Sequence, residues 1–124
     1  MEQDLKNKLQ QDPSGLLTYE YIANHIGQND ELMPELIANL IAVDRTGQFV
    51  VSTARYLNAI SPEKYAESID ILVKAAIDKD REHVYLPLLA ATIWGDDFRE
   101  RHEELSKRDD NFRRIYKRLY PNGL

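Results

Sequence analysis

The residue types that most often carry catalysis or bind metals are few and scattered in this chain. It has no cysteine, which excludes disulfides, zinc–thiolate sites and thiol chemistry. Its three histidines, His25, His83 and His102, lie far apart in the sequence. The segment RHEEL (101–105) begins like a zinc-protease helix, but Ser106 stands where the second histidine ligand belongs. We therefore expect no metal and no cofactor.

One acidic pair remains as a catalytic alternative. In WGDD (94–97), Asp96 and Asp97 follow an aromatic residue, and a hydrolase could use them together with His102 if a deep pocket joined them. Either aspartate could instead cap the start of the next helix after the glycine stop. The chain has five glycines, all at predicted breaks, which leaves no glycine-rich phosphate loop or nucleophile elbow. The sequence favours a protein that is not an enzyme.

The stretch LTYEYIANHIGQNDELMPELIANLI (17–41) resembles a helix-turn-helix, with Ala23 where the helices would cross and Gly27 at the turn. The helix that would enter the DNA groove, however, carries the carboxylates of Asp30, Glu31 and Glu35. No lysine or arginine occurs from residue 9 to residue 44, so nothing there would neutralise phosphates. We expect two packed helices rather than a DNA reader, and nucleic-acid binding by this hairpin is kept as the alternative function.

The segment NFRRIYKRLY (111–120) predicts a helix with one apolar and one basic face. Its basic face would bind RNA, an anionic membrane or an acidic protein patch, or it would only face solvent while the apolar face docks on the domain. The second interpretation is favoured, since the rest of the chain is acidic. The apolar face comprises Phe112, Ile115, Tyr116 and Leu119, and the basic face Arg113, Arg114, Lys117 and Arg118.

Length and charge place these segments in one small acidic domain. The chain has 124 residues and a net charge of −5. Residues 99–124 contain eight basic and five acidic residues, a net of +3, which leaves −8 for residues 1–98. The longest apolar run, VYLPLLAATIW (84–94), is too short to span a membrane, and the polar N-terminus does not read as a signal peptide. We expect a cytoplasmic protein without a membrane span.

Hydrophobic spacing predicts an all-α domain. Ser61 followed by Pro62 is a strong helix start, Asp30 is a predicted N-cap, and Pro87 predicts a local kink. Residues 1–15 are expected to form a polar N-terminal arm or a short helix, and residues 98–120 a C-terminal helical cover. The helices are expected over 17–26, 31–43, 48–60, 61–77 and 83–94, with two more between 98 and 120.

A 36-residue shift aligns two of these helix pairs. LIANLIAVDRTGQFVVSTARYL (36–57) then lies over LVKAAIDKDREHVYLPLLAATI (72–93), and the turn pair Asp44-Arg45 meets Asp80-Arg81. The span 31–97, with two such units, resembles the helical repeats of the HEAT and armadillo families. The alternative is that two amphipathic hairpins align by chance. The resemblance implies a short, right-handed, HEAT-like stack of antiparallel helix pairs with about six or seven helices.

A stack of this kind, without catalytic motifs, predicts a non-catalytic domain that binds another protein, with a second copy of itself as one candidate. The alternative is a nucleic-acid-associated regulator that uses the 17–41 hairpin or the basic 111–120 helix. Contact residues are expected among aromatic and basic side chains that a short stack cannot all bury: Arg55, Tyr56, Tyr85, Trp94, Arg99, Arg113, Arg114, Tyr116, Lys117 and Tyr120.

Overall fold

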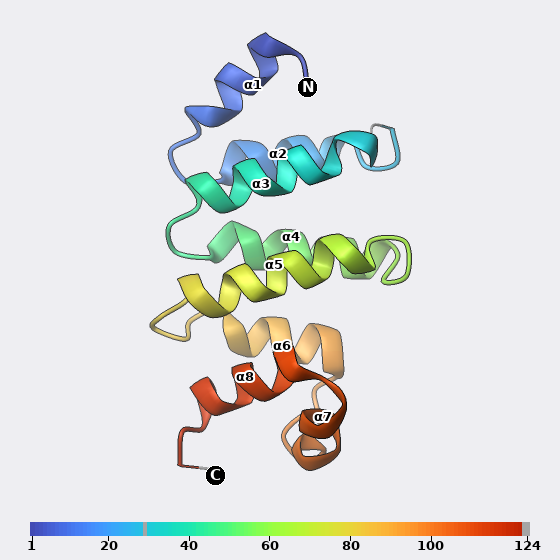
Figure 1. The fold of residues 1–124 in the computed structure, drawn as a ribbon, viewed down its shortest axis with the longest axis vertical. Coiled ribbons are helices and arrows are strands. Elements are labelled where there is room, and N and C mark those ends of the chain that lie inside the picture. The colour runs from blue at the N-terminus through green and yellow to red at the C-terminus, as the bar shows by residue number, and fades with distance from the viewer. Residues whose placement is uncertain (29, 123–124) are drawn as a thin grey trace.

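The computed structural model describes residues 1–28 and 30–122, and within these ranges the chain forms eight α-helices, one short 3₁₀ helix and no strand. All-α architecture is therefore confirmed. The helices follow one another up a single stack (Figure 1). They are α1 (Gln3–Gln10), α2 (Leu16–Asn24), η1 (Asp30–Leu32), α3 (Met33–Val43), α4 (Gln48–Ile60), α5 (Ala66–Lys79), α6 (Leu86–Trp94), α7 (His102–Arg108) and α8 (Asp110–Leu119).

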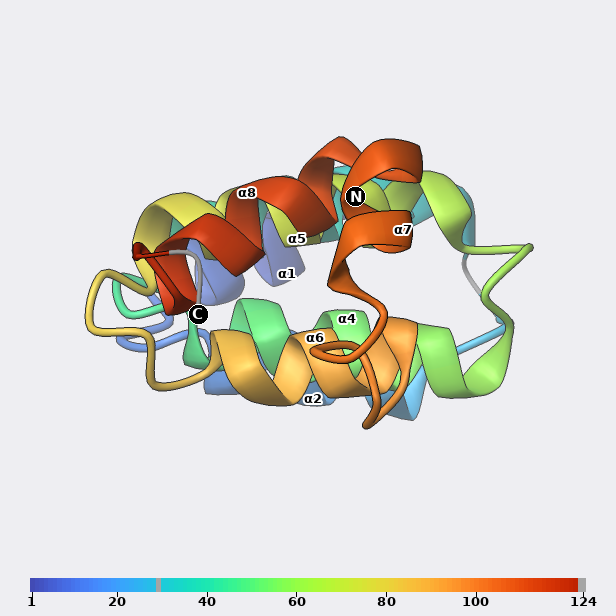
Figure 2. The same ribbon diagram turned by 90° about the horizontal axis from the view of Figure 1, so that it is seen from below.

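The helices form two layers. Helices α2, α4 and α6 lie side by side in one layer, while α1, α3, α5 and α8 form the other (Figures 1 and 2). The short helix α7 runs across the C-terminal end of the stack (Figure 2). Because each helix buries one apolar stripe, the core lies between the layers. Its fully buried members include Leu40, Leu57, Leu72, Leu89 and Phe112.

The three turns that connect α1 to α2, α3 to α4 and α5 to α6 share one feature. In each, a buried aspartate accepts hydrogen bonds from backbone N–H groups of the next helix. Asp12 Oδ2 accepts from Thr18 N at 2.8 Å, and its Oδ1 from Gly15 N at 2.9 Å. Asp44 does the same at the start of α4, and Asp80 at the start of α6. These bonds satisfy donors that a helix start leaves without intrahelical partners. The carboxylates therefore fix how α1–α2, α3–α4 and α5–α6 fold back on themselves.

The N-terminal arm predicted as polar contains helix α1. Leu9 is 2 % exposed and belongs to the core. Asn39 Nδ2 of α3 donates to the Leu9 carbonyl at 2.9 Å and to Thr18 Oγ1 at 3.1 Å. The first hairpin is thus tied to the second through a partly buried polar contact. The number of helices in the described residues exceeds the expected six or seven.

Two predicted helix starts are wrong. The Ser61–Pro62 signal caps only a turn: Ser61 Oγ accepts from Lys64 N at 3.2 Å, and α5 begins at Ala66. Asp30 is not an N-cap of α3, because Leu32 occupies that position. Instead Asp30 accepts from the Tyr65 hydroxyl at 3.2 Å and pairs with Lys64 at 2.8 Å. Both aspartate and serine found a nearby partner that sequence spacing does not reveal.

Two further local predictions fail near the C-terminal half. Neither Asp96 nor Asp97 caps α7, whose N-cap is Arg101 without a side-chain hydrogen bond. Pro87 lies at the first positions of α6, where a missing N–H breaks no intrahelical bond and no kink is needed. At the C-terminal end a side chain does cap α8, where Asp109 accepts from the backbone N–H groups of Asn111 and Phe112.

Candidate binding surfaces

The histidines and the acidic pair do not assemble into a catalytic arrangement. A hollow of about 710 Å³ is lined by His102 and other residues between 100 and 108, and neither Asp96 nor Asp97 lines it. Asp97 accepts from Arg101, and the His102 ring stacks on Tyr116 at 4.6 Å between centroids. Over residues 1–28 and 30–122, no three acidic or histidine side chains are grouped as metal ligands would be. The contacts of Asp97 and His102 are an ion pair and ring stacking, and they do not form a catalytic arrangement with Asp96.

The 17–41 hairpin is built as two packed helices joined by η1. One of its acidic groups is held by neighbours: the hydrogen bond from Lys64 lowers the pKa of Asp30, and bonds from Gly27 and Tyr65 add to this against the effect of burial. Glu31 and Glu35 are exposed on the same segment. The helix that would have to face DNA therefore presents fixed negative charge.

A continuous surface runs over the outward side of α2, α4 and α6. Arg55 of α4 donates from Nε to Thr92 Oγ1 of α6 at 2.9 Å. Tyr56, one residue on, donates its hydroxyl to the Ala23 carbonyl of α2 at 3.4 Å. Leu88, one turn before Thr92, is 51 % exposed. We call the surface formed by Ala23, Arg55, Tyr56, Leu88 and Thr92 the α4 face.

Aromatic side chains extend the α4 face toward the aspartate turns. Tyr19 and Phe49 lie with their ring centroids 6.1 Å apart, one from α2 and one from α4. Tyr85, which corresponds to Phe49 in the 36-residue shift, is half-buried at the N-cap of α6. The predicted contact residues Arg55, Tyr56 and Tyr85 thus lie on the same layer. Tyr19, Phe49 and Leu88 were not predicted, because helical spacing alone places them with the core or leaves them unassigned.

The other predicted contact residues gather at the C-terminal end, where they hold α6, α7 and α8 together. Trp94 Nε1 donates to Asp109 Oδ2 at 3.1 Å, and its ring meets Phe112 edge-on at 5.1 Å. The Arg99 guanidinium lies 4.3 Å from the centre of the Tyr120 ring. Tyr116 is 8 % exposed, so it adds little to any surface. These side chains are mainly structural.

Most cations of α8 also have acceptors within the chain. Arg113 pairs with Asp110 one turn away, and Arg114 Nη2 lies 3.7 Å from Asp78 Oδ1 of α5. Arg118 donates to the Ile77 carbonyl at 2.8 Å. Lys117 is exposed and has no ion pair within the part of the chain that the structure describes. The helix docks by its apolar face, and its charges largely serve that docking.

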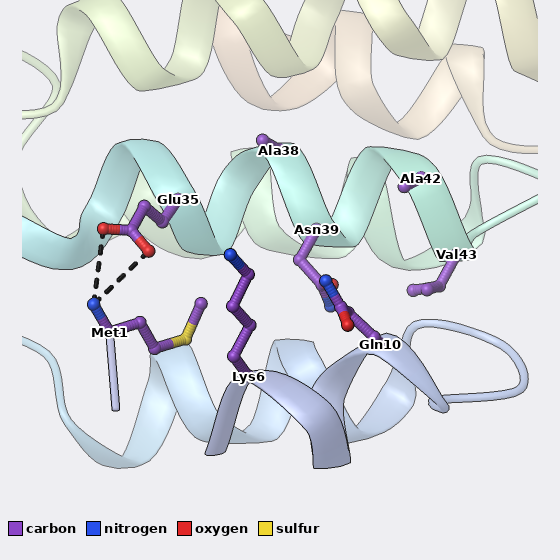
Figure 3. Close-up of a pocket in the computed structure, with 8 residues that line it drawn as sticks. All are labelled: Met1, Lys6, Gln10, Glu35, Ala38, Asn39, Ala42 and Val43. Carbon is purple, nitrogen blue, oxygen red and sulfur yellow. Dashed lines mark hydrogen bonds and ion pairs between the residues drawn. The ribbon is translucent and has the colours of Figure 1, made fainter. Parts of the chain in front are cut away.

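A shallow pocket of about 490 Å³ lies between α1 and α3 (Figure 3). Lys6 reaches across it from α1, and the Met1 amino group lies 3.4 Å from Glu35 on α3. Gln10 and Asn39 also line the pocket (Figure 3). Two cations, one carboxylate and two amides do not form a nucleophile–base pair, and the floor is made of small apolar side chains. They are Ala38, Ala42 and Val43.

Comparison of the chain with models of protein families, with curated proteins and with solved structures found no match in any of the three. Within the described residues, no helix combines the length and apolar character that crossing a membrane requires. Any functional conclusion therefore depends on the surfaces themselves.

Proposed function

We propose that this chain is a non-catalytic, HEAT-like domain that binds another protein through the α4 face. The observation that carries the proposal is the combination of Arg55, Tyr56 and an exposed Leu88 on adjacent helices. Arginine and tyrosine are enriched in the energetically important centres of protein interfaces. Arg55 and Tyr56 are also held by hydrogen bonds to the neighbouring helices, so little side-chain freedom remains to be lost on binding.

The proposal of a HEAT-like stack is supported by hydrogen bonds that recur at successive turns. Asp44 and Asp80, which the 36-residue shift aligns, are 1 % and 2 % exposed. Two aligned backbone N–H groups donate to each of them, those of Phe49 and Val50 to Asp44 and those of Tyr85 and Leu86 to Asp80. Asp12 adds a third turn of this kind, 32 residues before Asp44. A stack of such hairpins presents side chains of successive helices on one extended face, which is how helical repeats bind partners.

Site-specific photo-crosslinking tests the proposal. A photoreactive phenylalanine analogue replaces Ser52 on the outward side of α4, and in a matched control it replaces exposed Lys107 on α7. Illumination in an extract of the source cells is expected to give a discrete protein adduct from position 52 that the Arg55→Glu change removes. Equal adducts from both positions, or none from position 52, contradict a specific protein site there.

The nucleic-acid alternative is tested in parallel by titrating labelled duplex DNA and single-stranded RNA at low and physiological salt. We expect no binding at physiological salt, because the 17–41 hairpin is acidic and three of the four α8 cations have acceptors within the chain. Tight binding that weakens steeply with salt and is lost in Lys117→Glu would favour the regulator instead.

A further inference from the structure

An apolar groove lies on the opposite side of the molecule from the α4 face, between α3 and α5. These helices run alongside each other in the same direction in their layer (Figure 1). The groove has a volume of about 430 Å³, and Ile71 within it is 43 % exposed. Its lining is apolar except at two positions: Pro34, Ile37, Ala38, Ile41, Glu67, Ser68 and Ile71.

The groove is open because α3 lacks the side chains that close the next interface along the layer. On α5, the line Asp70, Lys74 and Asp78 faces α8, where Asp70 accepts from Asn111 at 2.7 Å and Asp78 pairs with Arg114. The 36-residue shift places Pro34, Ala38 and Ala42 on the same line of α3. Of these, Pro34 and Ala38 line the groove, and their small side chains offer no polar anchor; Ala42 lines the pocket between α1 and α3 instead. A backbone can therefore approach α3 closely.

One carboxylate, that of Glu67, lines the groove. Two more are exposed in the segments that lead into its helices, Glu31 in η1 before α3 and Glu63 in the turn before α5. None of the three has an ion pair within residues 1–28 and 30–122. The nearby lysines do not offset them, because Lys64 is bound by Asp30 and Lys74 by Asp70. The charge pattern selects a cationic occupant.

The chain itself shows how such an occupant packs on α5. Helix α8 buries Phe112 and Ile115 while Arg114 and Arg118 reach Asp78 and the Ile77 carbonyl of α5. A basic amphipathic helix is therefore already accommodated on one flank of α5. The open flank, shared with α3, has the apolar floor and the carboxylates for a second one.

We propose that the α3–α5 groove binds an amphipathic helix of a partner protein, with apolar side chains over Ile71 and Ala38 and lysine or arginine beside Glu67. Because cations are favoured at the C-terminal ends of helices, the occupant would run antiparallel to α3 and α5. The inference rests on the proposed function, since it identifies a second contact of the same protein-binding domain.

The test uses synthetic helical peptides of 18 residues and NMR chemical-shift mapping on the isotope-labelled full chain. The basic peptide has leucines on one face and lysines elsewhere, a second has glutamates in place of lysines, and a third has the basic composition scrambled to remove the apolar face. We expect the basic peptide to shift the signals of Ile37, Ala38 and Ile71, and to bind at least tenfold more tightly than either control peptide.

Ile71→Asp is expected to weaken the basic peptide at least tenfold, whereas Leu16→Asp, a similarly exposed position at the start of α2 in the other layer, leaves it unchanged. Shifts centred elsewhere, or equal binding of the acidic peptide, would overturn the assignment. Self-association of the wild type in sedimentation experiments that Ile71→Asp removes would show instead that a second copy covers the groove. Failure here leaves crosslinking from position 52 unaffected, so the two proposals fail separately.

Discussion

Three buried aspartates fix the turns that join the two layers of helices. Asp12, Asp44 and Asp80 are almost fully buried, and each accepts the first N–H groups of the following helix. A buried carboxylate is costly unless it is fully hydrogen-bonded, and these are. The same cap repeated three times makes successive hairpins alike.

Asp12→Asn is expected to reduce the free energy of unfolding by about 2 kcal/mol near neutral pH. An amide keeps the shape but cannot accept both at Oδ1, from Ser14 and Gly15, and at the second position, from the Thr18 N–H and hydroxyl. Denaturant unfolding monitored by circular dichroism measures this. A loss below about 0.5 kcal/mol would contradict the role of the cap.

The same variant should also change the response to acid. Burial alone would raise the pKa of Asp12, but hydrogen bonds from Thr18, Gly15 and Ser14 together outweigh it and hold the pKa below 3.8. The stabilisation is therefore complete above the ordinary aspartate pKa and is lost as the pH falls through the lowered value. Wild-type stability should fall more steeply below pH 4 than that of Asp12→Asn.

The fourth position of the three turns is glycine in the first two and histidine in the third. Gly15 and Gly47 both have positive φ, and a Cβ added to Gly15 would lie only 3.1 Å from Asp44 Cβ of the next turn. His83, at the corresponding position of the third turn, has φ +59°. Gly15→Ala should therefore cost about 1–2 kcal/mol, whereas His83→Gly should raise stability by up to about 1 kcal/mol. Thermal unfolding of both variants measures the two changes in stability. Equal changes in the two variants would contradict the prediction.

Thr53 has a buried hydroxyl group that forms no hydrogen bond within the described residues. It is fully buried in α4, and its hydroxyl has no hydrogen-bond partner within the described part of the chain. Thr53→Val keeps the shape and removes the unsatisfied group, so stability should rise by about 1 kcal/mol. Chemical unfolding measures the change. A destabilised variant would mean that the hydroxyl has a partner after all.

At the scale of elements, sequence spacing located most helices but not all of their starts. The bounds of α4 were predicted as 48–60 and agree with Gln48–Ile60, because its apolar stripe is long and Asp44 and Gly47 mark the preceding turn. The start of α5 was placed five residues too early, at 61 instead of Ala66, since Ser61 and Pro62 favour a helix start but form a turn. Next to this turn the Tyr65 hydroxyl donates to Asp30, 35 residues away in the sequence, a contact that local patterns do not predict.

Surfaces were harder to predict than helices. Arg55 and Tyr56 could be named because a short stack cannot bury every large side chain, whereas Trp94 and Tyr116 were assigned to a surface and instead pack at the end of the stack. A sequence shows which face of a helix is apolar, but it does not show which other helix packs against that face. The α3–α5 groove depends on such an uncovered face and was not predicted.

Phe112→Ala tests whether α8 is an integral part of the core. Phe112 is fully buried and meets the rings of Trp94 at 5.1 Å and Phe98 at 6.1 Å. The variant should lose about 3–5 kcal/mol, and the emission of Trp94, the single tryptophan, should shift to longer wavelength. Phe112→Leu, the control, should lose much less. An unchanged emission in the alanine variant would mean that α8 is only loosely attached.

As a whole, the molecule is a two-layer stack whose opposite sides differ in chemistry. One side presents the α4 face with Arg55, Tyr56 and Leu88, and the other presents an apolar groove beside Glu67. The sequence predicted an acidic body with a basic end, and the structure shows that the basic end is tied to α5 by Arg114 and Arg118. We propose that both sides bind protein segments rather than polyanions.

The most direct test is an equilibrium titration of the protein captured from position 52, purified, against the wild-type domain and two variants. The double variant Arg55→Ala/Leu88→Ala should bind at least tenfold more weakly, while Lys117→Ala, at an exposed position of α8, should bind as the wild type does. Circular dichroism confirms that all three are folded. Wild-type affinity in the double variant, or an equal loss in Lys117→Ala, would contradict binding through the α4 face.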